Sequence, residues 1–175
     1  MSSSERPIEP LRVLVIGRFQ PLHEGHVSLI EQALELGEVI IVVGSAQKDR
    51  THENPFTCRE RLEMLKATIQ EKGWDSSKLT IIPVEDIHSN GLWVAKVEML
   101  TPKFHTVMTH NKLVGQLFSE KGYVVVEPKP LHPEKFNGSK IREDFLKGKV
   151  IKGRVPKCVE KIMSMLNFTF LVQKN

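Results

Sequence analysis

The stretch from residue 12 to residue 27, RVLVIGRFQPLHEGHV, constrains the fold more than any other part of the chain. It begins with an apolar run at 13–16, which is typical of a strand buried in a parallel sheet. The strand must end between Gly17 and Pro21, because proline has no N–H to offer a sheet. From Gly25 onward the apolar residues recur at helical spacing: Val27, Leu29, Ile30, Ala33 and Leu34. The stretch therefore predicts a strand, a tight loop and a helix whose N-terminal N–H groups point to the carboxyl end of the strand.

The loop in this stretch carries nitrogen-bearing side chains that suit a polyanion. Arg18, His23 and His26 all fall in it or beside it. The two histidines could instead bind zinc, or one could cap the helix while the other packs, but no third metal ligand follows nearby. Since imidazole donates hydrogen bonds to phosphate oxygens and guanidinium is a fixed charge, we interpret the loop as a site for a nucleoside triphosphate.

Further apolar runs alternate with helical patterns along the rest of the chain. The predicted strands are 38–44, 79–84, 104–109 and 123–126, and the predicted helices are 58–70, 92–100, 113–119, 137–147 and 156–166. This alternation predicts an α/β fold, a Rossmann-like doubly wound parallel sheet of about five strands with helices on both faces. Ligands of such sheets bind outside the carboxyl ends of the strands. The tail at 168–172 could be an edge strand or an interface element.

Composition narrows the class of protein and its partners. We expect a disordered lead-in at 1–10, without the apolar core of a signal peptide, and a single domain at 11–175. Two cysteines 100 positions apart indicate a reduced, cytoplasmic chain. No apolar run is long enough to span a membrane, so we expect no membrane partner. The net charge of +4 suits an anionic ligand. Nucleic acid is disfavoured, because the chain lacks an arginine-rich arm and has a single tyrosine.

A second group of candidate site residues follows the third predicted strand, within 85–93. Asp86, Asn90 and Trp93 combine a carboxylate, an amide and a flat aromatic ring. A plain turn at Asn90-Gly91 and a core tryptophan would also explain the pattern. Because such a set could hold a planar carboxamide heterocycle, we interpret it as a place for the second substrate.

A third group opens the helix predicted from 137. Ser139 and the helix N-terminus could bind phosphate oxygens, and Arg142 would reach them from one turn further in. Taken alone, this pattern is more typical of an ordinary helix start with a surface arginine, and the first group upstream is what favours the functional interpretation.

The residues His23-Glu24-Gly25-His26 fit the H-x-G-H signature of the nucleotidylyltransferases. The longer string GRFQPLHEGH resembles the archaeal-type nicotinamide mononucleotide (NMN) adenylyltransferases more narrowly. The strings GSAQ, NPFT, MLTP and LFSEKGY, at 44–47, 54–57, 99–102 and 117–123, resemble the same group. The resemblance thus covers nearly all of residues 12–142.

This resemblance implies an enzyme that transfers AMP from ATP to NMN, giving NAD and pyrophosphate, with nicotinate mononucleotide as the other acceptor. It implies Mg²⁺ held mainly by phosphates and water, with no metal-ligating residues, and a homo-oligomer of hexameric form. The catalytic residues that it implies are Arg18, His23, His26 and Arg142. The substrate-binding residues are Gly17, Phe19, Gln20, Pro21, Gly25, Asp86, Asn90, Trp93, Asn111, Ser139 and Ile141.

Three departures from the family pattern bear on the site. His110 stands in a turn that is usually small and glycine-bearing, and Glu143 and Asp144 stand where relatives carry arginines. The lost positive charge could mark a non-catalytic nucleotide-binding regulator. A second alternative keeps the fold and changes the acceptor: another nucleotidylyltransferase, such as a phosphopantetheine adenylyltransferase, against which Asp86, Asn90 and Trp93 argue. We also expect Asp86 to disfavour nicotinate mononucleotide, because its carboxylate would lie near a like charge.

Overall fold

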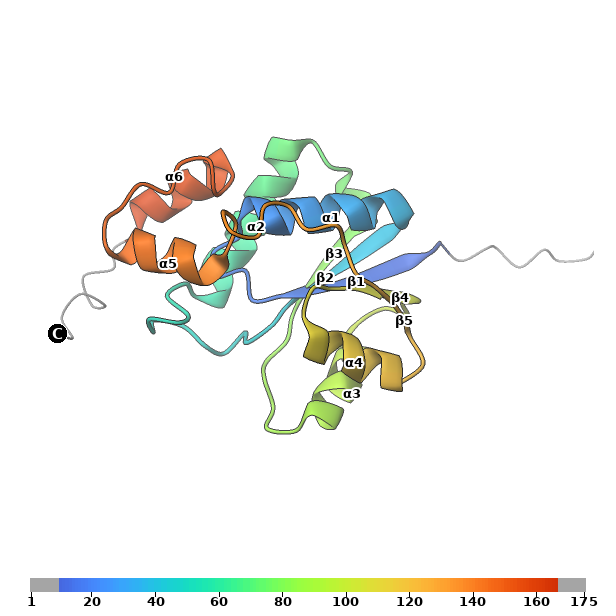
Figure 1. The fold of residues 1–175 in the computed structure, drawn as a ribbon. Helices are drawn as coiled ribbons and strands as arrows, with labels where there is room; N and C mark the ends of the chain where they lie inside the picture. Colours follow the sequence, from blue (N-terminus) through green and yellow to red (C-terminus); the bar gives the residue numbers. More distant parts are fainter. Residues whose placement is uncertain (1–9, 167–175) are drawn as a thin grey trace, which may run out of the picture.

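A computed structural model describes residues 10–166 of the chain, and its centre is a five-stranded sheet (Figure 1). The strands are β1 (Arg12–Gly17), β2 (Glu38–Val43), β3 (Leu79–Pro83), β4 (Thr106–Met108) and β5 (Val124–Val126). All pair in parallel, in the order β3-β2-β1-β4-β5. The predicted α/β doubly wound class is therefore confirmed. The predicted lead-in, apart from Pro10, and the predicted tail at 168–172 lie outside the described residues.

The helices cover both faces of the sheet, as the alternation predicts. They are α1 (Glu24–Leu36), α2 (Cys58–Lys72), α3 (Asn90–Leu100), α4 (Lys112–Glu120), α5 (Gly138–Leu146) and α6 (Lys157–Met165), with a short 3-10 helix, η1, at Ser76–Lys78. Thr57 and Glu60 form the capping box that starts α2, and Gly73 ends it in the left-handed conformation. None of the helices within residues 10–166 is long and apolar enough to cross a membrane.

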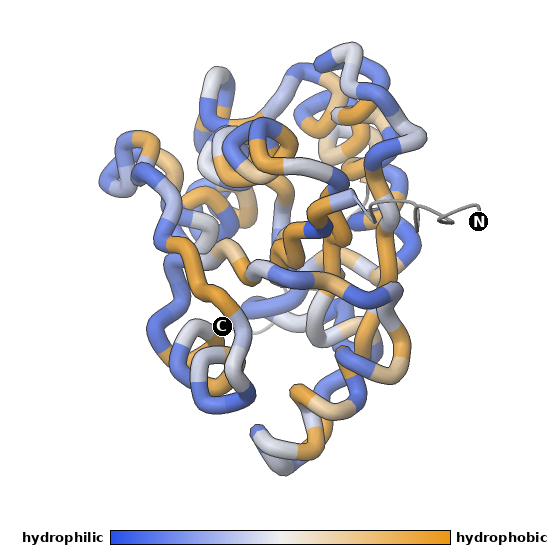
Figure 2. Tube along the Cα trace, turned by 90° about the vertical axis from the view of Figure 1, so that its right-hand side faces the viewer, coloured by the Kyte–Doolittle hydropathy of each residue, from blue (hydrophilic) through white to orange (hydrophobic). Residues whose placement is uncertain are grey.

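Two hydrophobic cores lie on opposite faces of the sheet because side chains alternate along each strand. Val13 and Val15 face the core formed with α1, α2, α5 and α6. Leu14 faces the smaller core, which α3 and α4 close. The middle of β1 is fully buried, whereas β3 and β5 are partly exposed at the edges. Figure 2 shows hydrophobic segments gathered in the interior and hydrophilic ones along the outer loops.

The strand order places a topological switch point between β1 and β4. The chain adds β2 and β3 on one side of β1, then crosses back to add β4 and β5 on the other. At such a point the connections leave in opposite directions and open a crevice at the carboxyl ends of the strands. The predicted loop at 17–23 follows β1 directly into this crevice.

Candidate active site

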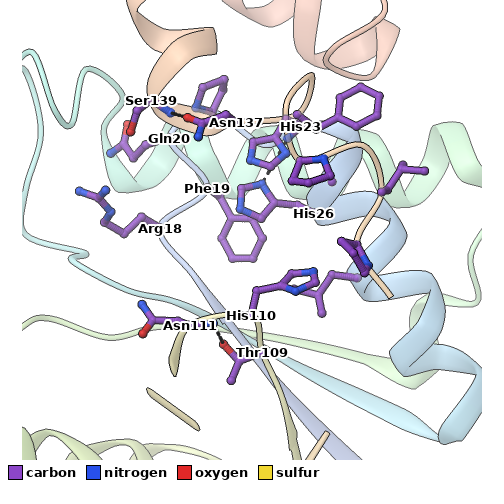
Figure 3. Close-up of a pocket in the computed structure, with 18 of the residues that line it drawn as sticks. Arg18, Phe19, Gln20, His23, His26, Thr109, His110, Asn111, Asn137 and Ser139 are labelled. Carbon is purple, nitrogen blue, oxygen red and sulfur yellow. Dashed lines mark hydrogen bonds between the residues drawn. The ribbon is translucent and has the colours of Figure 1, made fainter. Parts of the chain in front are cut away.

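A cavity of about 620 Å³ lies at this switch point (Figure 3). Its walls come from the loop after β1, the start of α1, the turn before α4 and the start of α5. The basic side chains in its lining are Arg18, His23, His26, His110 and Arg142, and no aspartate or glutamate within residues 10–166 lines it. The structure thus brings the first and third predicted groups together in one cationic, carboxylate-free cavity.

His23 and His26 form a stacked pair at the start of α1, with ring centroids 3.7 Å apart. The backbone N–H of His23 donates to Nδ1 of His26 over 3.3 Å, so the proton of a neutral His26 lies on Nε2. Gly25 makes this arrangement possible, because a Cβ there would lie 3.0 Å from the His23 ring. Nδ1 of His23 is buried without a partner among the described residues. A buried polar atom without a partner is costly and is typical of a site completed by a ligand.

Both histidines are held in the neutral form. Burial, followed by the charge of Arg142, lowers the pKa of His23 from 6.5 to about 4. Burial, followed by His23 and His110, lowers the pKa of His26 well below its ordinary value. At neutral pH the pair therefore offers N–H donors whose rings can gain a proton when negative charge arrives.

Arg142 is fixed beside these rings by two hydrogen bonds. Its Nη1 donates to the carbonyl oxygen of Gln20 over 2.8 Å, and its Nη2 donates to Oγ of Ser139 over 2.9 Å. Only 9% of the residue is exposed, and burial together with Arg18 lowers its pKa. Arg18 is exposed at the opposite wall, where its Nη1 lies 3.5 Å from Oδ1 of Asn54. Two guanidiniums thus face one cavity, one of them rigidly held.

The second predicted group lines a separate cavity of about 400 Å³ beyond the start of α4. Asp86, Asn90 and Trp93 all contribute to its wall. Oδ2 of Asp86 accepts from Oγ of Ser45 and lies 2.8 Å from Nζ of Lys48. Burial opposes the ionisation of Asp86, but the hydrogen bonds from Lys48 and Ser45 outweigh it and lower its pKa. Trp93 packs its ring edge-on against Phe118 as well, so it belongs partly to the core.

Comparison with known proteins identifies the family. The family described as cytidylyltransferase-like matches residues 14–144. The chain belongs to this family. It is 43% identical over 150 residues to the nicotinamide-nucleotide adenylyltransferase of Pyrococcus horikoshii, a match that covers 85% of this chain and 80% of the relative. It is 40% identical over 158 residues to the protein of the same name from Picrophilus torridus, a match that covers 90% of this chain and 92% of the relative.

Solved structures agree on the fold of this family. A bifunctional NMN adenylyltransferase/ADP ribose pyrophosphatase from Francisella tularensis matches with a TM-score of 0.81 at 23% identity, over 93% of this chain. The match covers 52% of that protein, so the chain spans about half of its length. A second structure of the same description, complexed with AMP and a manganese ion, matches with a TM-score of 0.70 at 20% identity.

Three of the family-derived positions, Gly17, Gln20 and Ile141, also have a packing role. Ile141 is fully buried in the larger core, and Gly17 packs against the Phe19 ring, where a Cβ would lie 3.0 Å from the ring. The buried Gln20 side chain exchanges hydrogen bonds with the backbone of Phe56, of 2.8 and 3.0 Å. The local packing thus uses each of these three side chains or Cα positions for structure, and their role in substrate binding stays a prediction. The contribution of Gln20 to the cavity is its carbonyl, which holds Arg142.

The remaining predicted positions do line the first cavity. Phe19 and Pro21 come from the loop after β1. Asn111 comes from the turn before α4, and Ser139 comes from the first turn of α5. The Asn111 side chain also accepts from the N–H of Val114 and so caps α4.

The carboxylates that replace family arginines do not face the cavity. Glu143 pairs with Lys147 on the same helix. Asp144 pairs with Arg154 at 2.7 Å and with Lys149 at 3.3 Å. Both carboxylates are thus paired with cations outside the cavity lining, while His110 adds a third imidazole to the cavity wall.

One residue important for this site escaped the sequence analysis. Arg61 is fully buried in α2 and donates to four backbone carbonyls, those of Arg18, Gly44, Ser45 and Thr57. It thereby ties the loop after β1 to the loop after β2. A signal was present: Arg61 precedes Met64 and Leu65 by three and four positions, so it falls on the buried stripe of an amphipathic helix.

Proposed function

We propose that this chain is an NMN adenylyltransferase, which transfers AMP from ATP to NMN to give NAD and pyrophosphate. One observation carries the proposal: a cationic cavity without carboxylates opens at the switch point of a chain 43% identical to curated nicotinamide-nucleotide adenylyltransferases. A cavity of this charge suits a triphosphate, and the second cavity beside it provides space for an acceptor.

In the proposed reaction a phosphate oxygen of NMN attacks the α-phosphorus of ATP in line. The bond between that phosphorus and the oxygen bridging to the β-phosphate breaks, and pyrophosphate leaves with both electrons of the bond. Such transfer needs positioning and charge stabilisation more than acid or base chemistry. His23 and His26 donate hydrogen bonds to phosphate oxygens, and Arg142 and Arg18 stabilise the charge that develops on the leaving group.

The acceptor is placed by the second cavity in this proposal. The nicotinamide ring stacks on Trp93, while the carboxamide exchanges hydrogen bonds with Asp86 and Asn90. These assignments follow from the residue types and their common cavity.

Mg²⁺ enters this reaction as part of the Mg·ATP substrate. Within residues 10–166 there is no group of three or more histidine, cysteine or acidic side chains that could hold a metal ion. The first cavity has no carboxylate wall, so phosphate oxygens and water supply the ligands. The proposal also includes a single domain at 11–175, a homo-oligomer of hexameric form and a cytoplasmic location, with no nucleic-acid or membrane partner.

The test is pyrophosphate release from Mg·ATP with NMN, nicotinate mononucleotide or phosphopantetheine as acceptor. The proposal expects turnover with NMN and none with phosphopantetheine. Turnover with phosphopantetheine alone would replace it with another transferase of the same fold. Tight ATP binding without turnover of any acceptor would replace it with a nucleotide-binding regulator.

A further inference from the structure

The second cavity contains a cation that the proposed reaction does not use. Lys48 lies in the loop after β2 and lines this cavity together with Asp86, Asn90 and Trp93. Its ammonium lies 2.8 Å from Oδ2 of Asp86, the oxygen that also accepts from Ser45. The cavity wall facing the acceptor thus carries an ion pair, not a lone carboxylate.

This pairing is set by a clamp between two loops. The side-chain amide of Gln47 accepts from the backbone N–H of Asp86 over 3.0 Å and donates to its carbonyl oxygen over 3.3 Å. Lys48 follows Gln47 directly, so the clamp brings the ammonium to the carboxylate. The clamp joins the loop after β2 to the loop after β3. The ion pair is therefore built into the cavity by the backbone arrangement.

The two charges have opposite effects on the choice of acceptor. A lone ionised Asp86 would accept a hydrogen bond from a carboxamide and repel a carboxylate. The ammonium of Lys48 offsets that repulsion and is itself a donor to a carboxylate oxygen. The side chain of Lys48 is 53% exposed, so the ammonium can turn toward a ligand while Ser45 continues to donate to Asp86.

Asn90 lets the same wall serve both acceptors. Its side-chain amide can accept from the NH₂ of a carboxamide or donate to an oxygen of a carboxylate, depending on which end faces the ligand. Lys48 and Asn90 can then donate to a carboxylate, and Asp86 and Asn90 can accept from a carboxamide.

We propose that Lys48 determines acceptor specificity: its ammonium pairs with the carboxylate of nicotinate mononucleotide and so sets how well this acid is used relative to NMN. This inference rests on the proposed function. It modifies the expectation that Asp86 disfavours nicotinate mononucleotide, because that expectation considered the carboxylate without its Lys48 partner.

The experiment compares kcat/KM for NMN and for nicotinate mononucleotide in the wild type, Lys48→Met and Lys96→Met. Lys96 on α3 is the matched control. Its Nζ lies 3.6 Å from Oε2 of Glu85 in the loop after β3, and it does not line the cavity. The wild type should use the two acceptors with kcat/KM values within about tenfold of each other. Lys48→Met should lower kcat/KM for nicotinate mononucleotide at least about tenfold more than for NMN, and Lys96→Met should leave the ratio as in the wild type.

A second pair of variants separates charge from shape. Lys48→Arg should restore most of the activity with the acid that Lys48→Met loses, because it keeps the positive charge. Asp86→Asn in the Lys48→Met background should also raise the use of the acid relative to NMN, because it removes the uncovered negative charge.

The outcomes that overturn the inference differ from those that overturn the proposed function. An acceptor ratio in Lys48→Met equal to that of the wild type, or a wild type more than about a hundredfold selective for NMN, overturns the role of Lys48 alone. A wild type that releases pyrophosphate with neither acceptor overturns the proposed function, and this inference with it.

Discussion

The two cavities differ in how firmly their charged groups are held. In the first cavity, His23 and Arg142 are 8% and 9% exposed, and Arg142 is fixed by a backbone carbonyl and a hydroxyl. In the second, the side chains of Lys48 and Asp86 are 53% and 35% exposed and pair with each other. The first is thus a preorganised electrostatic site, whereas the second is an adjustable one. The difference suggests that the first governs the rate of transfer and the second governs which acceptor is used.

The origin of this difference lies in the elements that build each cavity. The first is formed where α1 and α5 meet: a Cβ on Gly138 would lie 3.3 Å from Nε2 of His23. Both helices are anchored in the larger core. The second is formed by the loops after β2 and β3 together with the first turns of α3 and α4, and its charged side chains come from the two loops. Rigid elements favour precise catalysis, and loops favour variation in specificity.

The largest effect is expected from Arg142 in the first cavity. Arg142→Ala should lower kcat at least about 10²-fold, because charge builds on the leaving pyrophosphate and the guanidinium contact strengthens in the transition state. Arg142→Lys should recover only part of this loss, since an ammonium cannot make the paired contact. Steady-state pyrophosphate release at saturating Mg·ATP and NMN measures the effect.

The matched control for Arg142 is Arg59→Ala, because the Arg59 side chain is 89% exposed on α2. It should retain wild-type kcat. A nearly wild-type kcat in Arg142→Ala would show that the third predicted group has no role in transfer.

The next largest effect is expected from the stacked histidines. His26→Ala should lower kcat by about 10²-fold, the usual cost of removing one preorganised donor. The loss should be equal with NMN and with nicotinate mononucleotide if the first cavity acts on the phosphates alone. His52→Ala, at an exposed position in the loop before α2, serves as the control. A loss of kcat that differs between the two acceptors would show that the first cavity also contributes to the choice of acceptor.

A smaller and different effect is expected from Trp93 in the second cavity. Trp93→Ala should raise the KM for NMN far more than the KM for ATP, because it removes a stacking interaction worth roughly 1–3 kcal/mol of binding free energy. Because Trp93 also contacts Phe118, the melting temperature should fall in this variant. Trp93→Phe keeps an aromatic face and should recover most of the KM. Equal changes in both KM values would assign Trp93 to the core alone.

The sequence predicted the fold well because its patterns were local and strong. The apolar runs at 13–16 and 38–44 became the two central strands, and Thr57 and Gly73 mark the ends of α2 as expected. The helix expected from 92 begins at Asn90, within the usual uncertainty of helix boundaries. Which side of β1 each later strand would occupy could not be predicted, because local periodicity does not specify strand order.

The candidate site was only partly predictable. Motif residues such as His23 and Arg142 could be located from the sequence. The burial that keeps His23 neutral and the hydrogen bond that fixes Arg142 depend on contacts between distant segments, so they could not. For the same reason, the sequence could not show that Asp144 pairs with Arg154, which lies beyond the motif. The ion pair of Lys48 with Asp86 joins two loops 38 positions apart, which no local pattern encodes.

The last prediction concerns pH and again separates the two cavities. The folded-state pKa of His23, about 4, lies below its unfolded value of 6.5, so the unfolded chain binds a proton more readily. The stability is therefore intact above pH 6.5 and is lost progressively as the pH falls from 6.5 toward 4. At pH 5.5 the loss from this one group is about 1.4 kcal/mol relative to pH 7.5.

His23→Gln should remove this contribution, because glutamine does not titrate. Urea unfolding at pH 7.5 and 5.5 should show a smaller fall in the free energy of unfolding for His23→Gln than for the wild type, by about 1.4 kcal/mol. If His23→Gln and the wild type lose equal stability, His23 is not held neutral by burial. The contrast between a desolvated first cavity and a solvated second one would then fail at its most direct physical test.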